Sequence, residues 1–305
     1  MKIAAVVGLG TMGPGIAATL AKGGMDVRTY DLKPEVVEKA KGDVQTAFAV
    51  LERIGRPKAE KTGTVSFHTD LAESVAGVDL VIESVPERLE IKAKVFADLD
   101  RLARPDAMLA SNTSGIPITK LQEATARPGR VIGMHWSNPP HVIPVIEVIA
   151  GAKTDKAQVD SLKALITGLG LYPVVVKKDV PGFVENRVLY AIMRECLALA
   201  ENDVIDPADL DTCVKWGIGF KLAVIGPLEL LDVAGLDIYQ AVASYLNADL
   251  DKRGDVSSMI TERIARGDLG MKTGNGIYRY TPEQIQQLRM ARAGKLVGVR
   301  KTLEG

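Results

Sequence analysis

The stretch that decides the fold is residues 3–31, IAAVVGLGTMGPGIAATLAKGGMDVRTYD. It opens with a short apolar run, Ile3–Val7, and passes through a glycine-rich turn into an apolar helical pattern at Met12–Lys22. A second run, Asp26–Asp31, closes it. Strand, turn, helix and strand in this order form a βαβ unit, whose two strands are parallel members of one sheet. The stretch therefore predicts an α/β fold built on a parallel sheet.

Three glycines follow the first run at the spacing G-x-G-x-x-G, as Gly8, Gly10 and Gly13. The first allows a tight turn, the second lets backbone approach a pyrophosphate, and the third lets the helix pack closely on the strand. A helix beginning here also offers unpaired N–H groups and its positive dipole end to phosphate. The alternative is a glycine-rich turn without a ligand, but the flanking strand and helix favour a dinucleotide site. Thr11 and Met12 lie within the turn and are expected to contact the same cofactor.

Asp31, at the end of the second strand, bears on which dinucleotide binds. A carboxylate here accepts hydrogen bonds from the ribose hydroxyls and repels a 2′-phosphate. Lys33 follows and would offset part of that repulsion. We therefore expect NAD rather than NADP.

Strand and helix patterns alternate as far as residue 176. The further predicted strands are Val65–His68, Leu80–Glu83, Met108–Ser111, Val131–His135, Ile143–Val148 and Pro173–Val176. The predicted helices between them are Pro34–Leu51, Arg88–Leu102 and Lys156–Leu169. Such alternation is typical of a mostly parallel sheet with helices on both faces.

The pattern changes at residues 177–187, KKDVPGFVENR, where Pro181 and Gly182 mark a turn. Almost no strand pattern follows it. The predicted helices there are Glu185–Asn202, Pro207–Trp216, Pro227–Leu246, Val256–Arg266 and Pro282–Val297. We therefore predict two domains, a cofactor domain at residues 1–180 and an all-helical domain at 181–305.

The composition excludes several other classes of protein. Lys+Arg and Asp+Glu both number 38 in 305 residues, so the basic excess typical of nucleic-acid or membrane-surface binding is absent. Cys196 and Cys213 lie in helical apolar patterns and are expected to be buried free thiols, and the chain has too few Cys and His residues to favour a metal site. Ile3–Val7 is too short to span a bilayer, and no charged and apolar leader precedes it, so we expect a cytoplasmic protein.

Residues 111–147 carry the residue types that hydride transfer needs. His135 ends the apolar strand VIGMH, and the carboxyl ends of strands face the ligand crevice of an open α/β sheet. Glu147 lies in the apolar run VIEVI, where an unpaired carboxylate is costly, so a protonatable histidine is an expected partner. Asn112 and Ser114 follow another strand on the ligand side, where a hydroxyl can hold a substrate oxygen.

The other two histidines give weaker signals. His68 lies on a short strand with polar neighbours, which favours a structural role. His141 follows Pro139 and Pro140, and it fits a loop residue at the mouth of a site as well as a simple turn residue.

The whole chain resembles the 3-hydroxyacyl-CoA dehydrogenases. The motifs that carry the resemblance, in chain order, are GLGTMGPGIA, ESVPERLEIK, SNTSGIPIT, GMHWSNP, VIEVI, DVPGFVENR, GPLELLDVAGLD and GMKTGNGIY. The resemblance implies a Rossmann-type domain followed by a helical dimerisation domain, and hence a homodimer. The apolar stretch IGPLELLDVAGLDIYQAVASYL supports a buried face between two copies.

The resemblance also implies roles for particular residues. The catalytic histidine, glutamate, serine and asparagine of the family fall on His135, Glu147, Ser114 and Asn186 here. Glu87 and Lys92 match positions near the nicotinamide ribose, and Asn112 is expected to contact the cofactor.

The substrate stays open between an acyl-CoA and a small carboxylate without CoA. The helix that would meet CoA carries the apolar residues Ala47, Val50 and Leu51 in place of a cationic cluster, and phosphates prefer converging Lys or Arg. Trp136-Ser137 stands where family members usually carry an aromatic pair. We expect Trp136, Ser137 and Asn138 to lie at the floor of the site. The chain also resembles relatives from vitamin B6 degradation, which act on a small aromatic acid without CoA. A third alternative is a non-catalytic NAD-binding protein like the lens crystallins of the family.

Overall fold

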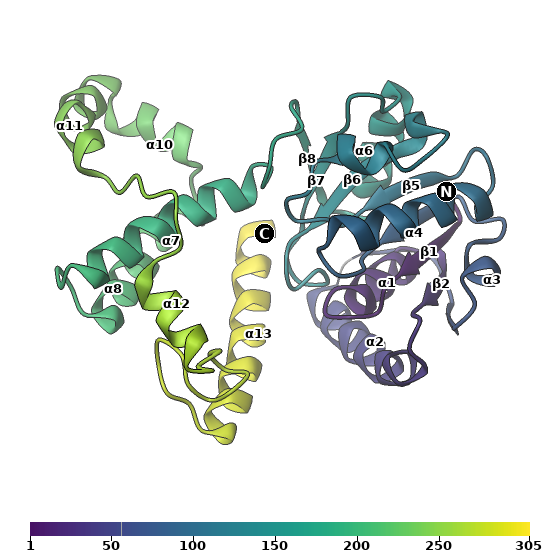
Figure 1. Cartoon of the computed structure of the whole chain (residues 1–305), viewed down its shortest axis with the longest axis horizontal. Coiled ribbons are helices and arrows are strands. Elements are labelled where there is room, and N and C mark those ends of the chain that lie inside the picture. Colours follow the sequence, from purple (N-terminus) through teal and green to yellow (C-terminus); the bar gives the residue numbers. More distant parts are fainter. Residues whose placement is uncertain (56) are drawn as a thin grey trace. The chain divides into compact units, whose positions relative to one another are not determined.

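The computed structural model describes residues 1–55 and 57–305. The chain packs into two compact units, residues 1–186 with 296–300 and residues 187–295 with 301–305 (Figure 1). The division into domains at residue 180 stays a prediction. Residues 181–186, which follow it, pack with the first unit.

The first unit is built on a sheet of eight strands in the order β3-β2-β1-β4-β5-β6-β7-β8. Neighbouring strands are parallel except β6 and β7, which are antiparallel. The strands are β1 (Ile3–Val7), β2 (Asp26–Tyr30), β3 (Val65–His68), β4 (Leu80–Glu83), β5 (Met108–Ser111), β6 (Val131–Trp136), β7 (Val145–Ala150) and β8 (Tyr172–Val176). The predicted mostly parallel sheet is confirmed.

Helices cover both faces of this sheet (Figure 1). They are α1 (Gly13–Lys22), α2 (Pro34–Ile54), α3 (Leu71–Val75), α4 (Leu89–Leu102), α5 (Ile118–Gln122) and α6 (Lys156–Gly168). One core lies between the sheet and helices α1 and α6, where Ile16 and Ile166 are fully buried. The other core lies between the sheet and helices α3, α4 and α5, where Phe96 and Leu121 are fully buried. Helix α2 packs mainly on α1, through Leu51 and neighbours, and also contacts Val65 and Phe67 of β3.

The strand order places the site. The chain runs from β1 outward to β2 and β3, then returns to β4 on the other side of β1, so the order reverses between β1 and β4. Ligands of open α/β sheets bind outside the carboxyl ends of strands at such a point. The carboxyl ends of β1, β4, β5 and β6 all lie at this edge, because these strands are mutually parallel.

The second unit contains helices without strands. Its helices are α7 (Glu185–Glu201, its first two residues in unit one), α8 (Pro207–Cys213), α9 (Phe220–Leu222), α10 (Pro227–Ala234), α11 (Leu236–Asp249), α12 (Ser258–Ala265) and most of α13 (Pro282–Glu304). The single helix predicted at 227–246 is wrong, because Gly235 adopts φ +100° and separates α10 from α11. Val214–Gly219 forms a π-helical turn after α8.

The second unit leaves most of its apolar side chains exposed. Within residues 187–295 only Ala198 and Ser257 are buried. Cys213 is exposed and Cys196 half-buried, so the expected burial of both thiols is wrong, although both are free. None of the described helices combines the length and the apolar character needed to cross a membrane.

Candidate active site

The glycine loop after β1 has the close contacts that its spacing predicts. Gly8 has φ +101°, and a Cβ there would lie 2.6 Å from the carbonyl oxygen of Ser84. A Cβ on Gly13 would lie 2.1 Å from the carbonyl oxygen of Gly8, so the first turn of α1 packs directly on the loop. Gly10 is exposed, with nothing within 4 Å of its Cβ position. The loop therefore leaves an open approach to backbone at the helix N-terminus, which fits a pyrophosphate.

Asp31 is oriented by the same loop. Its Oδ2 accepts a hydrogen bond from the backbone N–H of Leu9 at 2.9 Å, and its Oδ1 accepts one from the N–H of Lys33 at 3.1 Å. The carboxylate thus lies beside the glycine loop, as a ribose-binding acid must. Thr11 is exposed in the loop, whereas the side chain of Met12 packs against the core under α1. These residues fit NAD, which when bound supplies a hydride acceptor.

A buried ion network joins the ends of β4 and β5. Lys92 on α4 is 1% exposed, and its ammonium contacts the carboxylate of Glu83 at 2.7 Å and that of Glu87 at 3.3 Å. Its third contact is the carbonyl oxygen of Val85 at 3.2 Å, which accounts for all three ammonium hydrogens. Glu83 also accepts a hydrogen bond from the hydroxyl of Ser111 at 2.6 Å. Lys92 therefore braces the strand ends from within the protein.

Glu87, which contacts Lys92, is also hydrogen-bonded to the loop after β5. Its Oε1 accepts hydrogen bonds from the hydroxyl of Thr113 at 2.6 Å and from the backbone N–H groups of Ser114 and Gly115 at 3.0 and 3.1 Å. Partial burial raises the pKa of Glu87, but these hydrogen bonds and the charge of Lys92 outweigh it and leave the pKa lowered. An ionised Glu87 thus fixes the backbone that carries Ser114, whose side chain is exposed.

Asn112 ties three strand ends together. Its side-chain oxygen accepts a hydrogen bond from the backbone N–H of Trp136 at 2.8 Å, and its amide donates to the hydroxyl of Ser84 at 3.2 Å. Asn112 is 8% exposed, so both contacts are largely protected from water. The amide holds the ends of β4, β5 and β6 in register beside the glycine loop.

His135 and Glu147 form a buried pair across the antiparallel strands β6 and β7. They are direct partners in the strand register, and Nδ1 of His135 lies 2.7 Å from Oε2 of Glu147. His135 is 5% exposed and Glu147 is 2% exposed. With Nδ1–H donated to the carboxylate, Nε2 is the ring nitrogen left to accept a proton. The ring of Phe183 lies 5.9 Å from the imidazole, centroid to centroid.

The second oxygen of Glu147 holds the N-terminus of α7. Oε1 accepts hydrogen bonds from the backbone N–H groups of Val184 at 2.9 Å and Glu185 at 3.1 Å. Burial raises the pKa of Glu147, but the hydrogen bond from His135 and these two amides outweigh it and leave the pKa lowered. One ionised carboxylate therefore orients the histidine and caps the helix.

The first turn of α7 adds two polar side chains. The amide of Asn186 donates to the backbone oxygen of Ser114 at 2.7 Å, which brings together two residues 72 positions apart. Ser137 donates a short hydrogen bond to Oε2 of Glu185. Glu185 is a site residue that the sequence does not predict, and its only signal is its place in the motif DVPGFVENR, four residues after Pro181.

Two neighbours of this site have other roles. Trp136 is 1% exposed and belongs to the core beneath α1 and α6, because side chains alternate along β6 and Trp136 points away from His135. The expectation that Trp136 lies at the site floor is therefore wrong. His141 packs against α1: a Cβ on Gly15 would lie 2.7 Å from its Nδ1, which is buried and has no hydrogen-bond partner among the residues that the structure describes.

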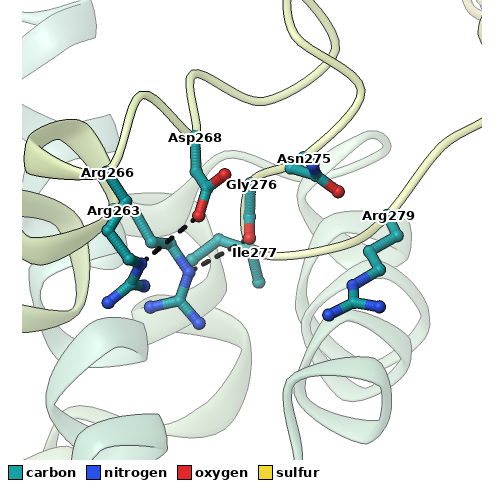
Figure 2. A pocket seen from close by; sticks show the side chains of 7 residues that line it. All are labelled: Arg263, Arg266, Asp268, Asn275, Gly276, Ile277 and Arg279. Carbon is teal, nitrogen blue, oxygen red and sulfur yellow. Dashed lines mark hydrogen bonds and ion pairs between the residues drawn. The ribbon is translucent and has the colours of Figure 1, made fainter.

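The second unit has a basic pocket of its own, of about 550 Å³ (Figure 2). Its lining includes Arg263, Arg266 and Arg279. Arg263 donates to the carbonyl oxygen of Gly276, and Arg266 pairs with Asp268 at 3.4 Å. Two of the three arginines are thus engaged in holding the loop at residues 267–279, which contains the whole motif GMKTGNGIY.

Comparison with known proteins agrees with this geometry. Residues 3–180 match the 3-hydroxyacyl-CoA dehydrogenase NAD binding domain, and residues 182–280 match the C-terminal domain of the same family. A 5-formyl-3-hydroxy-2-methylpyridine 4-carboxylate 5-dehydrogenase from Mesorhizobium japonicum is 56% identical over 99% of this chain and 98% of its own length. A probable 3-hydroxybutyryl-CoA dehydrogenase from Deinococcus radiodurans is 36% identical over 90% of this chain and 99% of its own.

A solved structure is similar throughout. It is that of a 5-formyl-3-hydroxy-2-methylpyridine 4-carboxylic acid 5-dehydrogenase, described as an NAD⁺-dependent dismutase, with a TM-score of 0.98 at 55% identity. It covers 100% of this chain and 99% of its own. The expectation of NAD and of an oxidoreductase is confirmed, and the chain belongs to the 3-hydroxyacyl-CoA dehydrogenase family.

Proposed function

We propose that this enzyme oxidises an aldehyde on a small pyridine carboxylate with NAD⁺, and reduces the same aldehyde with NADH. The observation that carries the proposal is the similarity to the Mesorhizobium dehydrogenase, which extends over nearly the full length of both chains. The buried apolar face of helix α2 supports a substrate without CoA. Ala47 and Leu51 are buried against α1 and offer no cation to a phosphate.

His135 acts as the general base in oxidation and as the general acid in reduction. Glu147 holds Nδ1–H, so Nε2 faces the reacting oxygen in one tautomer, and its charge stabilises the imidazolium that forms. Protonation of Glu147 would abolish this orientation, and its lowered pKa keeps it ionised near neutral pH.

Ser114 and Asn186 hold the substrate oxygen on which negative charge develops. The proposal is supported by the hydrogen bond between them, which keeps one amide hydrogen of Asn186 available beside the exposed hydroxyl of Ser114. Cofactor contacts are assigned to Gly8, Gly10, Thr11, Met12, Gly13, Asp31, Glu87 and Asn112. Lys92 acts on the cofactor through Glu87, since its ammonium is fully engaged.

The enzyme works as a homodimer in the cytoplasm. The support for a dimer is the exposed apolar surface of the helical unit, which includes Phe220, Leu228 and Tyr245 at 63, 77 and 63%. Surface of this extent usually marks a protein interface. Two free thiols fit a reducing compartment. Sedimentation at micromolar concentration tests the dimer, and a monomer alone would contradict it.

The substrate assay compares three reactions of two compounds with purified enzyme. They are 5-formyl-3-hydroxy-2-methylpyridine-4-carboxylate with NAD⁺, the same aldehyde with NADH, and acetoacetyl-CoA with NADH. The proposal expects turnover of the aldehyde in both directions. Turnover of acetoacetyl-CoA alone would replace it with the acyl-CoA reaction.

A further inference from the structure

A second carboxylate lies beside the His135–Glu147 pair. A ring nitrogen of His135, an oxygen of Glu147 and an oxygen of Glu185 all lie within 4.8 Å of one another. His135 and Glu147 are buried and Glu185 is half-buried. Glu185 lies within the motif DVPGFVENR, but the mechanism above gives it no role, although a second carboxylate at this distance strongly affects what can bind.

Ser137 holds this carboxylate in place. Ser137 is the first residue after β6 and follows His135 by two positions, so continued alternation along the chain places its side chain on the same side as that of His135. Ser137 is 6% exposed, and its hydroxyl donates to Oε2 of Glu185. No described residue donates to Oε1 of Glu185, so this oxygen can accept a hydrogen bond from a ligand.

The same three residues do not favour a metal ion. Nδ1 of His135 is bound to Oε2 of Glu147, and Oε1 of Glu147 accepts two backbone N–H groups. Glu185 gives one oxygen to Ser137. A cation would have to displace these hydrogen bonds, whereas a hydroxyl donor needs only the remaining oxygen of Glu185.

We propose that Glu185, positioned by Ser137, accepts a hydrogen bond from the second hydroxyl of an aldehyde hydrate. A secondary alcohol has one hydroxyl on its reacting carbon. His135, Ser114 and Asn186 are enough to bind and deprotonate that one hydroxyl. An aldehyde that is oxidised without a covalent nucleophile reacts through its hydrate, which has two. The additional acceptor beside His135 therefore makes this an aldehyde-hydrate site, an inference that rests on the proposed function.

The atoms of the step balance. Water adds to the aldehyde carbon, and the hydrate carries two hydroxyls and one C–H bond. The C–H bond breaks and its hydrogen leaves with the electron pair to NAD⁺, while one hydroxyl proton passes to Nε2 of His135. The hydrate oxygen that was hydrogen-bonded to Glu185 becomes the second oxygen of the product acid. One aldehyde, one water and one NAD⁺ give one carboxylate, one NADH and two protons.

The test compares the two directions of reaction in one variant. Reduction of the aldehyde by NADH needs no hydrate, so Glu185→Gln should spare it. We expect kcat/KM for oxidation to fall by about 10² and that for reduction by less than about threefold. Ser137→Ala should lower the ratio of kcat/KM for oxidation to kcat/KM for reduction in the same way, and Glu185→Asp should restore part of that ratio. Glu283→Gln changes a first-turn glutamate of α13 and should leave the ratio unchanged.

A binding measurement supplies a readout without turnover. A trifluoroacetyl analogue of the aldehyde exists as its hydrate and gives up no hydride. With NAD⁺ present, Glu185→Gln should weaken its binding by about tenfold, as loss of a hydrogen bond to a charged acceptor predicts. The corresponding alcohol should bind wild type and variant alike.

Two outcomes overturn the inference in distinguishable ways. Equal losses in both directions, with unchanged binding of the hydrate analogue in Glu185→Gln and Ser137→Ala, would overturn the role of Glu185 alone. A wild-type enzyme that reduces acetoacetyl-CoA but turns over no aldehyde would overturn the proposed function and this inference with it.

Discussion

Glu147 accepts the Nδ1–H of His135 with one oxygen and two backbone amides of the α7 N-terminus with the other. The carboxylate that orients the proposed catalytic base is therefore also the N-terminal cap of a helix. The first two residues of α7, Glu185 and Asn186, are positioned by the hydrogen bonds between Glu147 and the helix N-terminus. Loss of Glu147 should disturb both the base and the helix start, whereas loss of His135 should disturb the base alone.

This difference predicts how two variants diverge. His135→Ala should lower kcat by about 10² or more, the usual effect of removing a general base, with little change in NAD affinity. Glu147→Ala should lower kcat as much and also destabilise the protein by roughly 1 kcal/mol or more, since a helix cap is lost. Steady-state kinetics, NADH fluorescence titration and urea unfolding measure the three effects. Near-normal turnover of His135→Ala would remove it from the mechanism.

Much of this arrangement could be predicted from the sequence. Strands β1, β4 and β5 have the predicted bounds, because strands buried on both faces read as short continuous apolar runs. The edge strand β3, which is only partly buried, also has the predicted bounds. The antiparallel start of β7 is offset from the prediction, since Val142 and Ile143 bond back to Pro139 in a turn and the strand begins only at Val145.

The contact between Ser137 and Glu185 could not be predicted in the same way. The two residues are 48 positions apart, and neither lies in a pattern with its own period. Only the path of the chain after β8, which returns the segment at residues 181–186 to the end of β6, brings them together. Side-chain pairs formed by tertiary packing leave no local signal.

Asp31 should control the choice of cofactor. Its carboxylate is oriented by the N–H of Leu9 and lies where ribose hydroxyls would bind. Asp31→Ala should weaken NAD and reduce the preference for NAD over NADP, because the acceptor and the repulsive charge are both lost. The measurement is kcat/KM with each cofactor. An unchanged ratio would show that another residue recognises the ribose.

Lys92 should stabilise the protein only together with Glu83. Glu83 is fully buried, so Lys92→Met leaves a carboxylate without its cation and should cost about 3–5 kcal/mol. The double variant Glu83→Gln/Lys92→Met should recover part of this loss, because the unpaired charge is gone. Urea unfolding of the single and double variants gives the comparison. A double variant less stable than the sum of both single changes would contradict this reading.

His141 should make stability depend on pH. Burial lowers the pKa of His141, and Nδ1 has no partner to stabilise a charge. As the pH falls through about 6.5, the unfolded chain therefore takes up a proton more readily than the folded one, and folding loses free energy. His141→Phe should reduce this loss. The measurement is the melting temperature of His141→Phe and of wild type between about pH 5 and pH 7.5, a range that spans the ordinary histidine pKa. Parallel curves would assign the pH dependence to other groups.

The last prediction concerns substrate size. Ala47 and Leu51 of α2 are buried, Val50 packs with Ile54, and the described part of this helix presents no converging cations near them. The diphosphate and 3′-phosphate of CoA bind strongly only where several Lys or Arg side chains meet. Acyl-CoA turnover should therefore show a high KM, and free CoA should inhibit the aldehyde reaction poorly. The deciding measurement is kcat/KM for acetoacetyl-CoA with NADH. A value of about 10⁵ M⁻¹s⁻¹ or more, well within the range of efficient enzymes, would restore the acyl-CoA reaction. Tight inhibition by CoA would show that its phosphates bind through groups other than α2.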